Sequence, residues 1–399
     1  MFDNNFFVNM SSRKKVLLRA PVLTQSGYGV HSRQIARWLL SKPNLDVHVQ
    51  ALPWGSTPWL INKDLSGGLI GRIMEKTADP TGQKYDATVQ VQLPNEWDTS
   101  MSSTNIGISA VVETDICNPA WVHACNRMTK VIVPSKFCHS VLSSSGQLTT
   151  DVKVIPESFP DEILEPESTR VDDIKFQTQF NFLMIGQITG KNAENDRKNI
   201  FYTIKWFCET FNKDNDVGLV IKTNMGRNTK IDRQIVENTI KSVLLEIKKK
   251  KEPKIYLLHG EMSDAEMASL YRHPQIKALV TLTRGEGYGL PILEAAASGL
   301  PIIATNWSGH LDFMSKGKFV GVDFNLGNVH PSRIDNEIFV QNARWANPVE
   351  EDFKKKILKF KSSSSLPKEW ATELSAKIKQ QYNFSTISKM YDEELSFIL

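Results

Sequence analysis

The chain has 399 residues, of which 41% are hydrophobic and 23% are charged, close to the globular average, so a disordered or fibrous protein is excluded. Lys and Arg outnumber Asp and Glu by only 48 to 44, and the net charge of +4 is too weak to indicate a dedicated nucleic-acid-binding protein. At roughly 150 residues per domain, the length predicts two large domains.

The N-terminal segment does not have the order of a secretory signal peptide. Asn4 and Asn5 interrupt its apolar residues, and the basic cluster at residues 13–15 follows them. No window offers about 20 consecutive apolar residues, so we expect no membrane-spanning segment. The 4 cysteines are unevenly spaced, which favours reduced thiols over disulfides or a zinc site. We therefore expect a cytoplasmic protein.

Short β-branched runs alternate with amphipathic stretches along the first half of the chain. Residues 15–20 are typical of a strand, a loop through Gly27 and Gly29 follows, and residues 32–40 have helical spacing of apolar side chains. Further strands are expected at residues 47–52, 87–91, 106–112 and 131–133. This alternation predicts a parallel sheet covered by helices on both faces.

The second half of the chain repeats the same alternation. Strands are predicted at residues 181–186, 218–222, 254–258 and 278–283, and helices at residues 200–211 and 231–250. Residues 157–179 are rich in Pro, Glu, Asp and Ser, which is typical of a domain boundary. We expect a first domain at residues 1–170, a second at residues 171–380, and a C-terminal helix at residues 381–399 that docks on a core.

A glycine-rich loop at residues 285–289 follows one of these strands. Pro291 suits the first turn of a helix, and Gly299 suits the end of that helix. The loop therefore leads from the carboxyl end of a strand to a helix N-terminus. Backbone N–H groups and the helix dipole can bind a phosphate there.

Two carboxylates lie in this unit. Glu286 stands among the glycines, where we expect poor shielding from solvent and from any bound phosphate. That position is unfavourable unless the carboxylate binds hydroxyl groups or stabilises positive charge. Glu294 lies in the first turns of the helix, where the dipole also favours an acid. A solvated loop acid and a helix-stabilising acid are the alternative interpretations.

Together with their flanking residues, these two carboxylates resemble the E-x7-E signature of glycosyltransferase family 4. Seven residues separate Glu286 from Glu294, and Gly-Glu-Gly-Tyr-Gly-Leu-Pro surrounds the first. The resemblance covers residues 181–313 well and the first half only in layout. It implies an α/β protein of the GT-B fold, with two Rossmann-like domains whose parallel sheets face each other across a cleft. It also implies that the C-terminal helix returns to the first domain.

The resemblance implies catalytic roles for Glu286 and Lys198 and a donor-binding role for Arg197. Glu286 would contact the hydroxyl groups of the donor sugar near the reacting centre. Lys198, together with Arg197, would neutralise the departing diphosphate, because a fixed cation stabilises developing negative charge. The alternative for both cations is a solvated helix start.

Further donor contacts are implied by the same resemblance. Glu294 would hold the ribose of the nucleotide, and the N–H groups around Gly289 and Leu290 would face the sugar and the phosphate. The loop with Gly27 and Gly29 would close over the diphosphate, although an ordinary turn between strand and helix is the alternative.

The sequence also departs from the family pattern. Gln187 stands where the family often has an arginine, which puts one phosphate contact in doubt. Glu113 and Asp115 stand where a histidine is common. Either could bind the acceptor or act as a base, but a loop acid or a helix cap is an equal alternative.

We therefore expect a retaining glycosyltransferase that moves a sugar, most simply a hexose, from a nucleotide-diphosphate sugar to an unidentified acceptor without a metal or cofactor. Polysaccharide, glycolipid, protein and modified DNA remain open as acceptors. A nucleotide- or sugar-binding protein on a decayed transferase scaffold is the alternative, and the joint presence of Glu286, Glu294 and Lys198 argues against it. A dinucleotide oxidoreductase is disfavoured, because the turn before Gly27 is long and the second strand lacks a terminal acid.

Overall fold

The computed structural model describes residues 13–165, 174–188, 190, 192–247 and 253–399. The N-terminal segment before residue 13, the middle of the expected domain boundary and the end of the helix predicted to reach residue 250 lie outside the described residues.

The first half of the chain forms a six-stranded sheet with the order β2-β1-β3-β4-β5-β6, and all neighbouring strands are parallel. Its strands are β1 (Lys14–Ala20), β2 (Leu45–Ala51), β3 (Ala87–Val91), β4 (Asn105–Ile108), β5 (Lys130–Val133) and β6 (Val152–Val154). The connecting helices are α1 (Gly27–Leu40), α2 (Leu69–Lys76), α3 (Pro119–Cys125) and α4 (Lys136–Ser145). Short 3-10 turns cover Pro94–Glu96 and Asp161–Ile163.

A second six-stranded parallel sheet has the order β12-β11-β10-β7-β8-β9. Its strands are β7 (Phe180–Ile185), β8 (Val217–Thr223), β9 (Lys254–His259), β10 (Ile276–Thr281), β11 (Ile302–Thr305) and β12 (Val320–Val322). Its helices are α5 (Ile200–Thr210), α6 (Lys230–Glu246), α7 (Asp264–Tyr271), α8 (Leu290–Ala297), α9 (Leu311–Met314) and α10 (Glu350–Ser362).

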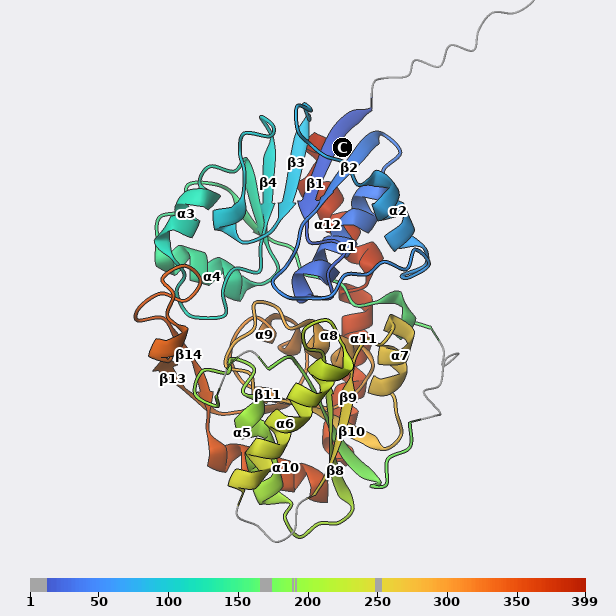
Figure 1. Ribbon diagram of the computed structural model, residues 1–399, viewed down its shortest axis with the longest axis vertical. Helices are drawn as coiled ribbons and strands as arrows, with labels where there is room; N and C mark the ends of the chain where they lie inside the picture. The colour runs from blue at the N-terminus through green and yellow to red at the C-terminus, as the bar shows by residue number, and fades with distance from the viewer. Residues whose placement is uncertain (1–12, 166–173, 189, 191, 248–252) are drawn as a thin grey trace, which may run out of the picture.

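The two sheets lie one above the other, each with its own covering helices (Figure 1). The α/β architecture with two parallel sheets is therefore confirmed. The carboxyl ends of β1, β7 and β8 lead into loops that meet between the two sheets. This arrangement places the ends of strands from both halves around one space, which is where open parallel sheets bind ligands.

The last helices of the chain connect the two halves. α11 (Ser365–Gln381) packs against the second sheet's helix α8, and α12 (Phe384–Glu394) lies beside α1 in the first half (Figure 1). Ile387, Tyr391 and Leu395 are buried in the first hydrophobic core. The predicted return of the C-terminal helix to the first half is confirmed, and a 3-10 turn at Ser396–Ile398 follows it.

Two predicted elements have different bounds. α1 begins at Gly27 rather than at residue 32, because Ser26 caps the helix with its hydroxyl oxygen, which accepts a hydrogen bond from Gly29 N–H at 2.9 Å. β4 ends at Ile108 rather than at residue 112. Val111 there adopts a φ of 54°, which is incompatible with a strand.

An antiparallel hairpin of β13 (Phe324–Asn328) and β14 (Arg344–Pro348) was not predicted. The segment between its strands, which includes a 3-10 turn at Pro331–Arg333, reaches the first half of the chain. Phe339 and Trp345 are buried there in one apolar cluster with Trp121 and Val111. The hairpin therefore joins the two halves on the side of α3 and α4 (Figure 1).

Candidate functional site

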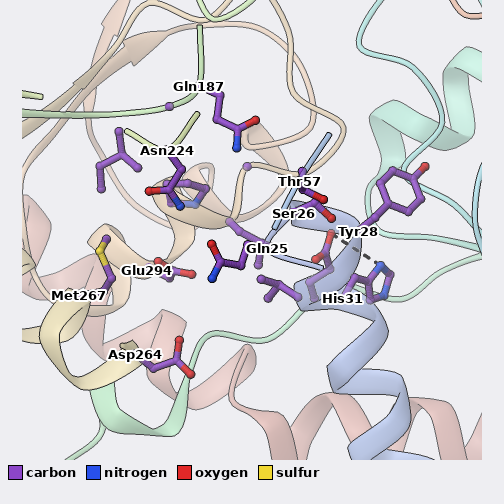
Figure 2. Close-up of a pocket in the computed structure, with 18 of the residues that line it drawn as sticks. Gln25, Ser26, Tyr28, His31, Thr57, Gln187, Asn224, Asp264, Met267 and Glu294 are labelled. Atoms are coloured by element: carbon purple, nitrogen blue, oxygen red, sulfur yellow. Dashed lines mark ion pairs between the residues drawn. The ribbon is translucent and has the colours of Figure 1, made fainter. Parts of the chain in front are cut away.

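A cavity of about 610 Å³ lies between the two halves of the molecule. It is lined by the loops after β1, β7, β8 and β10 and by the first turns of α1 and α8 (Figure 2). The predicted site residues in its wall are Gly27, Glu113, Arg197, Lys198, Glu286, Gly289, Leu290 and Glu294. Residues far apart in the sequence thus surround one space.

Glu286 and Lys198 form an ion pair in this cavity. The Lys198 ammonium donates to both carboxylate oxygens of Glu286, at 2.6 and 2.8 Å. Burial raises the pKa of Glu286, but the charges of Lys198 and Arg197 lower it more, to about 2. Glu286 is therefore ionised at neutral pH and accepts hydrogen bonds.

The expectation that Glu286 is poorly shielded from solvent is wrong, because Glu286 is only 7% exposed to solvent. The loop that carries it packs directly onto the first half of the chain. A Cβ atom on Gly285 would lie 2.2 Å from the carbonyl oxygen of Glu113, so only glycine permits this approach. The Ser135 hydroxyl also donates to the carbonyl of Gly287 at 2.6 Å. These contacts fold the loop inward and bury the carboxylate.

Arg197 connects the two carboxylates on this side of the cavity. One guanidinium nitrogen lies 3.1 Å from Glu113 Oε1 and the other 3.5 Å from Glu286 Oε2. The same group donates to the carbonyl oxygen of Gly285 at 2.6 Å. Because Lys198 and Arg197 both lie at Glu286 in the wall of the cavity, this end of the cavity suits an anion.

Glu294 lies further along α8, beside Tyr271. The Tyr271 hydroxyl donates to Glu294 Oε2 at 2.8 Å. Burial raises the pKa of Glu294 to about 8, although the hydrogen bond from Tyr271 lowers it. The negative charge of Asp264 also raises this pKa. The carboxyl is therefore mostly protonated at neutral pH, and it faces the cavity (Figure 2). A neutral carboxyl both donates and accepts a hydrogen bond, as a sugar hydroxyl requires.

The two glycines of the first loop occupy different positions. Gly27 lines the cavity, and its Cα faces open space. Gly29 is not among the lining residues. A Cβ atom there would lie 2.1 Å from the carbonyl oxygen of Thr24, so Gly29 lets the loop fold back at the start of α1. Of these two glycines, Gly27 is therefore the one that borders the cavity.

The two acids on the first-half loop also separate. Glu113 lines the cavity and forms an ion pair there with Arg197. Asp115 is not a lining residue. It accepts hydrogen bonds from the backbone N–H of Arg344 at 2.6 Å and from its Nε at 2.7 Å. Asp115 thus holds the β13–β14 hairpin against the first half.

Several lining residues were not singled out from the sequence, among them Tyr28, Glu157 and Lys222. Glu157 follows β6 and Lys222 lies near the end of β8, so both occupy the carboxyl ends of parallel strands. That position is the signal that could have identified them. Burial lowers the pKa of Lys222 to about 8, while its ammonium donates to the carbonyl of Gly260 at 2.6 Å.

Within the described part of the chain, no group of three or more His, Cys, Asp or Glu side chains is arranged to hold a metal ion. None of its helices is long and apolar enough to cross a membrane. Asp214 and Asp216, which imitate a metal-binding D-x-D pair, form a turn in which the backbone N–H of Asp216 donates to Asp214 Oδ1 at 3.0 Å.

Comparison with known proteins finds a family model that matches part of the chain. Residues 195–325 match the family model described as glycosyl transferases group 1. This range contains the ion pair, the glycine-rich loop and α8. No curated protein matches the chain.

Solved structures share the fold at low sequence identity. Sucrose-phosphate synthase from Thermosynechococcus elongatus has a TM-score of 0.61 and 12% identity, over 97% of this chain and 99% of that one. HepE from Anabaena, in complex with UDP-glucose, has a TM-score of 0.59 and 12% identity, over 96% and 99%.

A longer protein also contains this fold. TarM from S. aureus, in a complex that includes UDP, has a TM-score of 0.51 and 15% identity over 77% of this chain. The match covers 54% of TarM, so the chain spans about half the length of that protein. At these identities the likeness establishes the two-sheet architecture.

Proposed function

We propose that this protein is a glycosyltransferase that takes its sugar from a nucleoside-diphosphate sugar. The observation that carries the proposal is the buried Lys198–Glu286 pair at one end of the cavity, inside the stretch that matches the glycosyl transferases group 1 model. The binding of UDP-glucose by HepE and of UDP by TarM supports a donor of this class.

The diphosphate of the donor would lie beside Lys198, Arg197 and the start of α8. When the bond between the sugar and the diphosphate breaks, negative charge develops on the leaving oxygen. Fixed cations stabilise that charge without reorganising, which lowers the barrier. Since these groups supply the positive charge, the proposal includes transfer without a metal ion.

Glu286 would have two tasks in this reaction. Its pKa of about 2 keeps it ionised, so it accepts hydrogen bonds from donor sugar hydroxyls and does not supply a proton. Before the donor binds, it also neutralises Lys198. A bound diphosphate would share the Lys198 ammonium with Glu286. Donor binding would therefore affect the position of the Glu286 carboxylate.

The acceptor would enter from the first half of the molecule, where Glu113 borders the cavity. Attack from the same face as the departing diphosphate would retain the configuration of the donor sugar, and we include retention and a hexose donor in the proposal. Proton NMR of the first product from an α-linked donor tests retention, and a β-linked product contradicts it. Activity lost with a chelator and restored by manganese contradicts metal independence.

The function itself is tested with a donor screen. The protein is incubated with UDP-, GDP- and ADP-linked hexoses, with and without a mixture of oligosaccharide, glycolipid, protein and hydroxymethylated-DNA acceptors. We expect one nucleoside diphosphate to be released above the protein-free control. Binding of a nucleotide sugar without any release favours the alternative of a binding protein on this scaffold.

A further inference from the structure

Glu157 is a buried carboxyl in the cavity wall without a hydrogen-bond partner. It follows β6, and its residue is 4% exposed. Its Oε2 atom accepts and donates no hydrogen bond within the described residues. Its Oε1 atom lies 3.9 Å from His31 Nδ1, beyond hydrogen-bond distance.

The contact with His31 does not compensate the burial of this carboxyl. Burial raises the pKa of Glu157 to about 8, with a further contribution from Glu294, and burial lowers the pKa of His31 to about 3. Both side chains are therefore largely neutral near pH 7 and form no charged pair. A buried polar group without a partner reduces the stability of the fold, so packing alone does not explain an acid at this position.

Glu157 shares the cavity with Glu294, and the two carboxyls are close enough to affect each other electrostatically. Each is mostly protonated, so each presents one O–H donor and one acceptor oxygen. Such a pair would repel a phosphate once ionised, and the cations that suit a phosphate, Lys198 and Arg197, lie at a different carboxylate, Glu286. An uncharged part of a ligand that carries two adjacent hydroxyl groups matches the pair, because each carboxyl can exchange a hydrogen bond with one hydroxyl.

We propose that Glu157 is a second ribose-binding residue, which hydrogen-bonds one hydroxyl of the vicinal diol of the donor nucleotide while Glu294 bonds the other. This inference rests on the proposed function, because it needs a nucleoside-diphosphate donor. It assigns to the cavity a preference for ribonucleotides over deoxyribonucleotides, set by one residue from each half of the molecule.

The test measures binding by calorimetry at pH 7. UDP, GDP and ADP are compared first, and the tightest is then compared with its 2′-deoxy and 3′-deoxy forms. Each deoxy form should bind the parent protein about tenfold more weakly, since each lacks one hydrogen bond inside a buried site. This arm uses the unmodified protein and does not depend on the folding of any variant. Equal binding of either deoxy form overturns the inference.

The second arm uses Glu157→Leu, with Glu162→Leu as the control that removes another acid from the wall of the same cavity. In Glu157→Leu, one of the two deoxy forms should bind as well as the ribonucleotide, while the other keeps its tenfold loss. The control should behave as the parent does. An equal loss for all three nucleotides overturns the inference. If the parent binds none of the nucleoside diphosphates, the proposed function fails as well, and that result is distinct from the others.

Discussion

The Lys198 side chain illustrates how one residue can serve both the empty and the occupied site. Its ammonium is held by two oxygens of Glu286 in the described structure. The Lys198 ammonium is therefore already positioned when a diphosphate binds, and the diphosphate would compete for it with the Glu286 carboxylate. The two residues should consequently have opposite effects on nucleotide binding.

Lys198→Ala should weaken the binding of a nucleoside diphosphate by roughly 10- to 100-fold, because one charge-assisted hydrogen bond is lost. Glu286→Gln should leave this affinity equal or higher, because Lys198 loses its competing anion. Calorimetry with the nucleoside diphosphate measures both affinities. Equal weakening by the two substitutions would contradict the sharing of Lys198.

Glu157 should make the stability of the protein depend on pH. Its pKa is about 8 in the folded chain and 4.5 as the ordinary value, so the folded state keeps a proton that the unfolded state releases. By linkage, the folded state loses stability as pH rises through this window. Glu157→Leu removes this pH-dependent loss of stability. The melting temperature of the variant, relative to that of the parent, should therefore rise between pH 5 and pH 8. A difference that stays constant with pH would contradict the raised pKa.

At the scale of single residues, the sequence predicted which side chains meet but not their environment. Glu286 is predicted from the E-x7-E motif, and Lys198 and Arg197 from a separate stretch that resembles the same family; all three line one cavity. The burial of Glu286 depends on Gly285 packing against the carbonyl of Glu113, a contact between distant parts of the chain. No local pattern encodes such a contact.

At the scale of elements, regular strands and helices were predictable because each has a hydrophobic period of its own. A capping box of Ser263 and Glu266 begins α7, and this local S-x-x-E spacing is one that a sequence shows directly. The β13–β14 hairpin escaped prediction, because its buried side chains pack on the first half of the chain. Its strands carry Leu326, which is 40% exposed, beside the fully buried Trp345, so periodicity alone gave no clear signal.

Trp345 should stabilise the contact between the hairpin and the first half. It is 1% exposed, and the Arg284 guanidinium lies 5.2 Å from its ring centroid. Trp345→Ala should cost about 3–5 kcal/mol and lower the melting temperature by several degrees in scanning calorimetry. Leu326→Ala, in the partner strand, is the control and should change it little. Equal effects of the two substitutions would show that Trp345 is not part of a joined core.

At the scale of the whole molecule, the chain crosses between the two halves more than once. α12 leaves the second half and completes the core of the first, where Trp38 Nε1 donates to Asp392 Oδ1 at 2.8 Å. The hairpin forms a second connection. Since the cavity lies between the halves, its shape depends on both connections. The sequence predicts a C-terminal helix that docks on a core, and the family resemblance predicts the half on which it docks.

Leu395 tests the first of these connections. It is fully buried in the core of the first half, although it is among the last residues of the chain. Leu395→Ala should reduce the free energy of unfolding by about 2–5 kcal/mol, because the cavity that it leaves cannot collapse completely. Phe397→Ala, at a residue that is 46% exposed, should have a much smaller effect. Denaturant unfolding that ranks the two variants in the reverse order would contradict the docking of α12.

The most direct test of the proposed transferase is the release of nucleoside diphosphate from the donor that the screen selects, measured for the parent and two variants. Glu286→Gln should reduce release by orders of magnitude while nucleotide binding persists. Glu209→Gln, which removes an ion pair with Lys354 outside the cavity, should release the nucleotide as the parent does. Undiminished release by Glu286→Gln, or no release by the parent from any donor, would contradict the account.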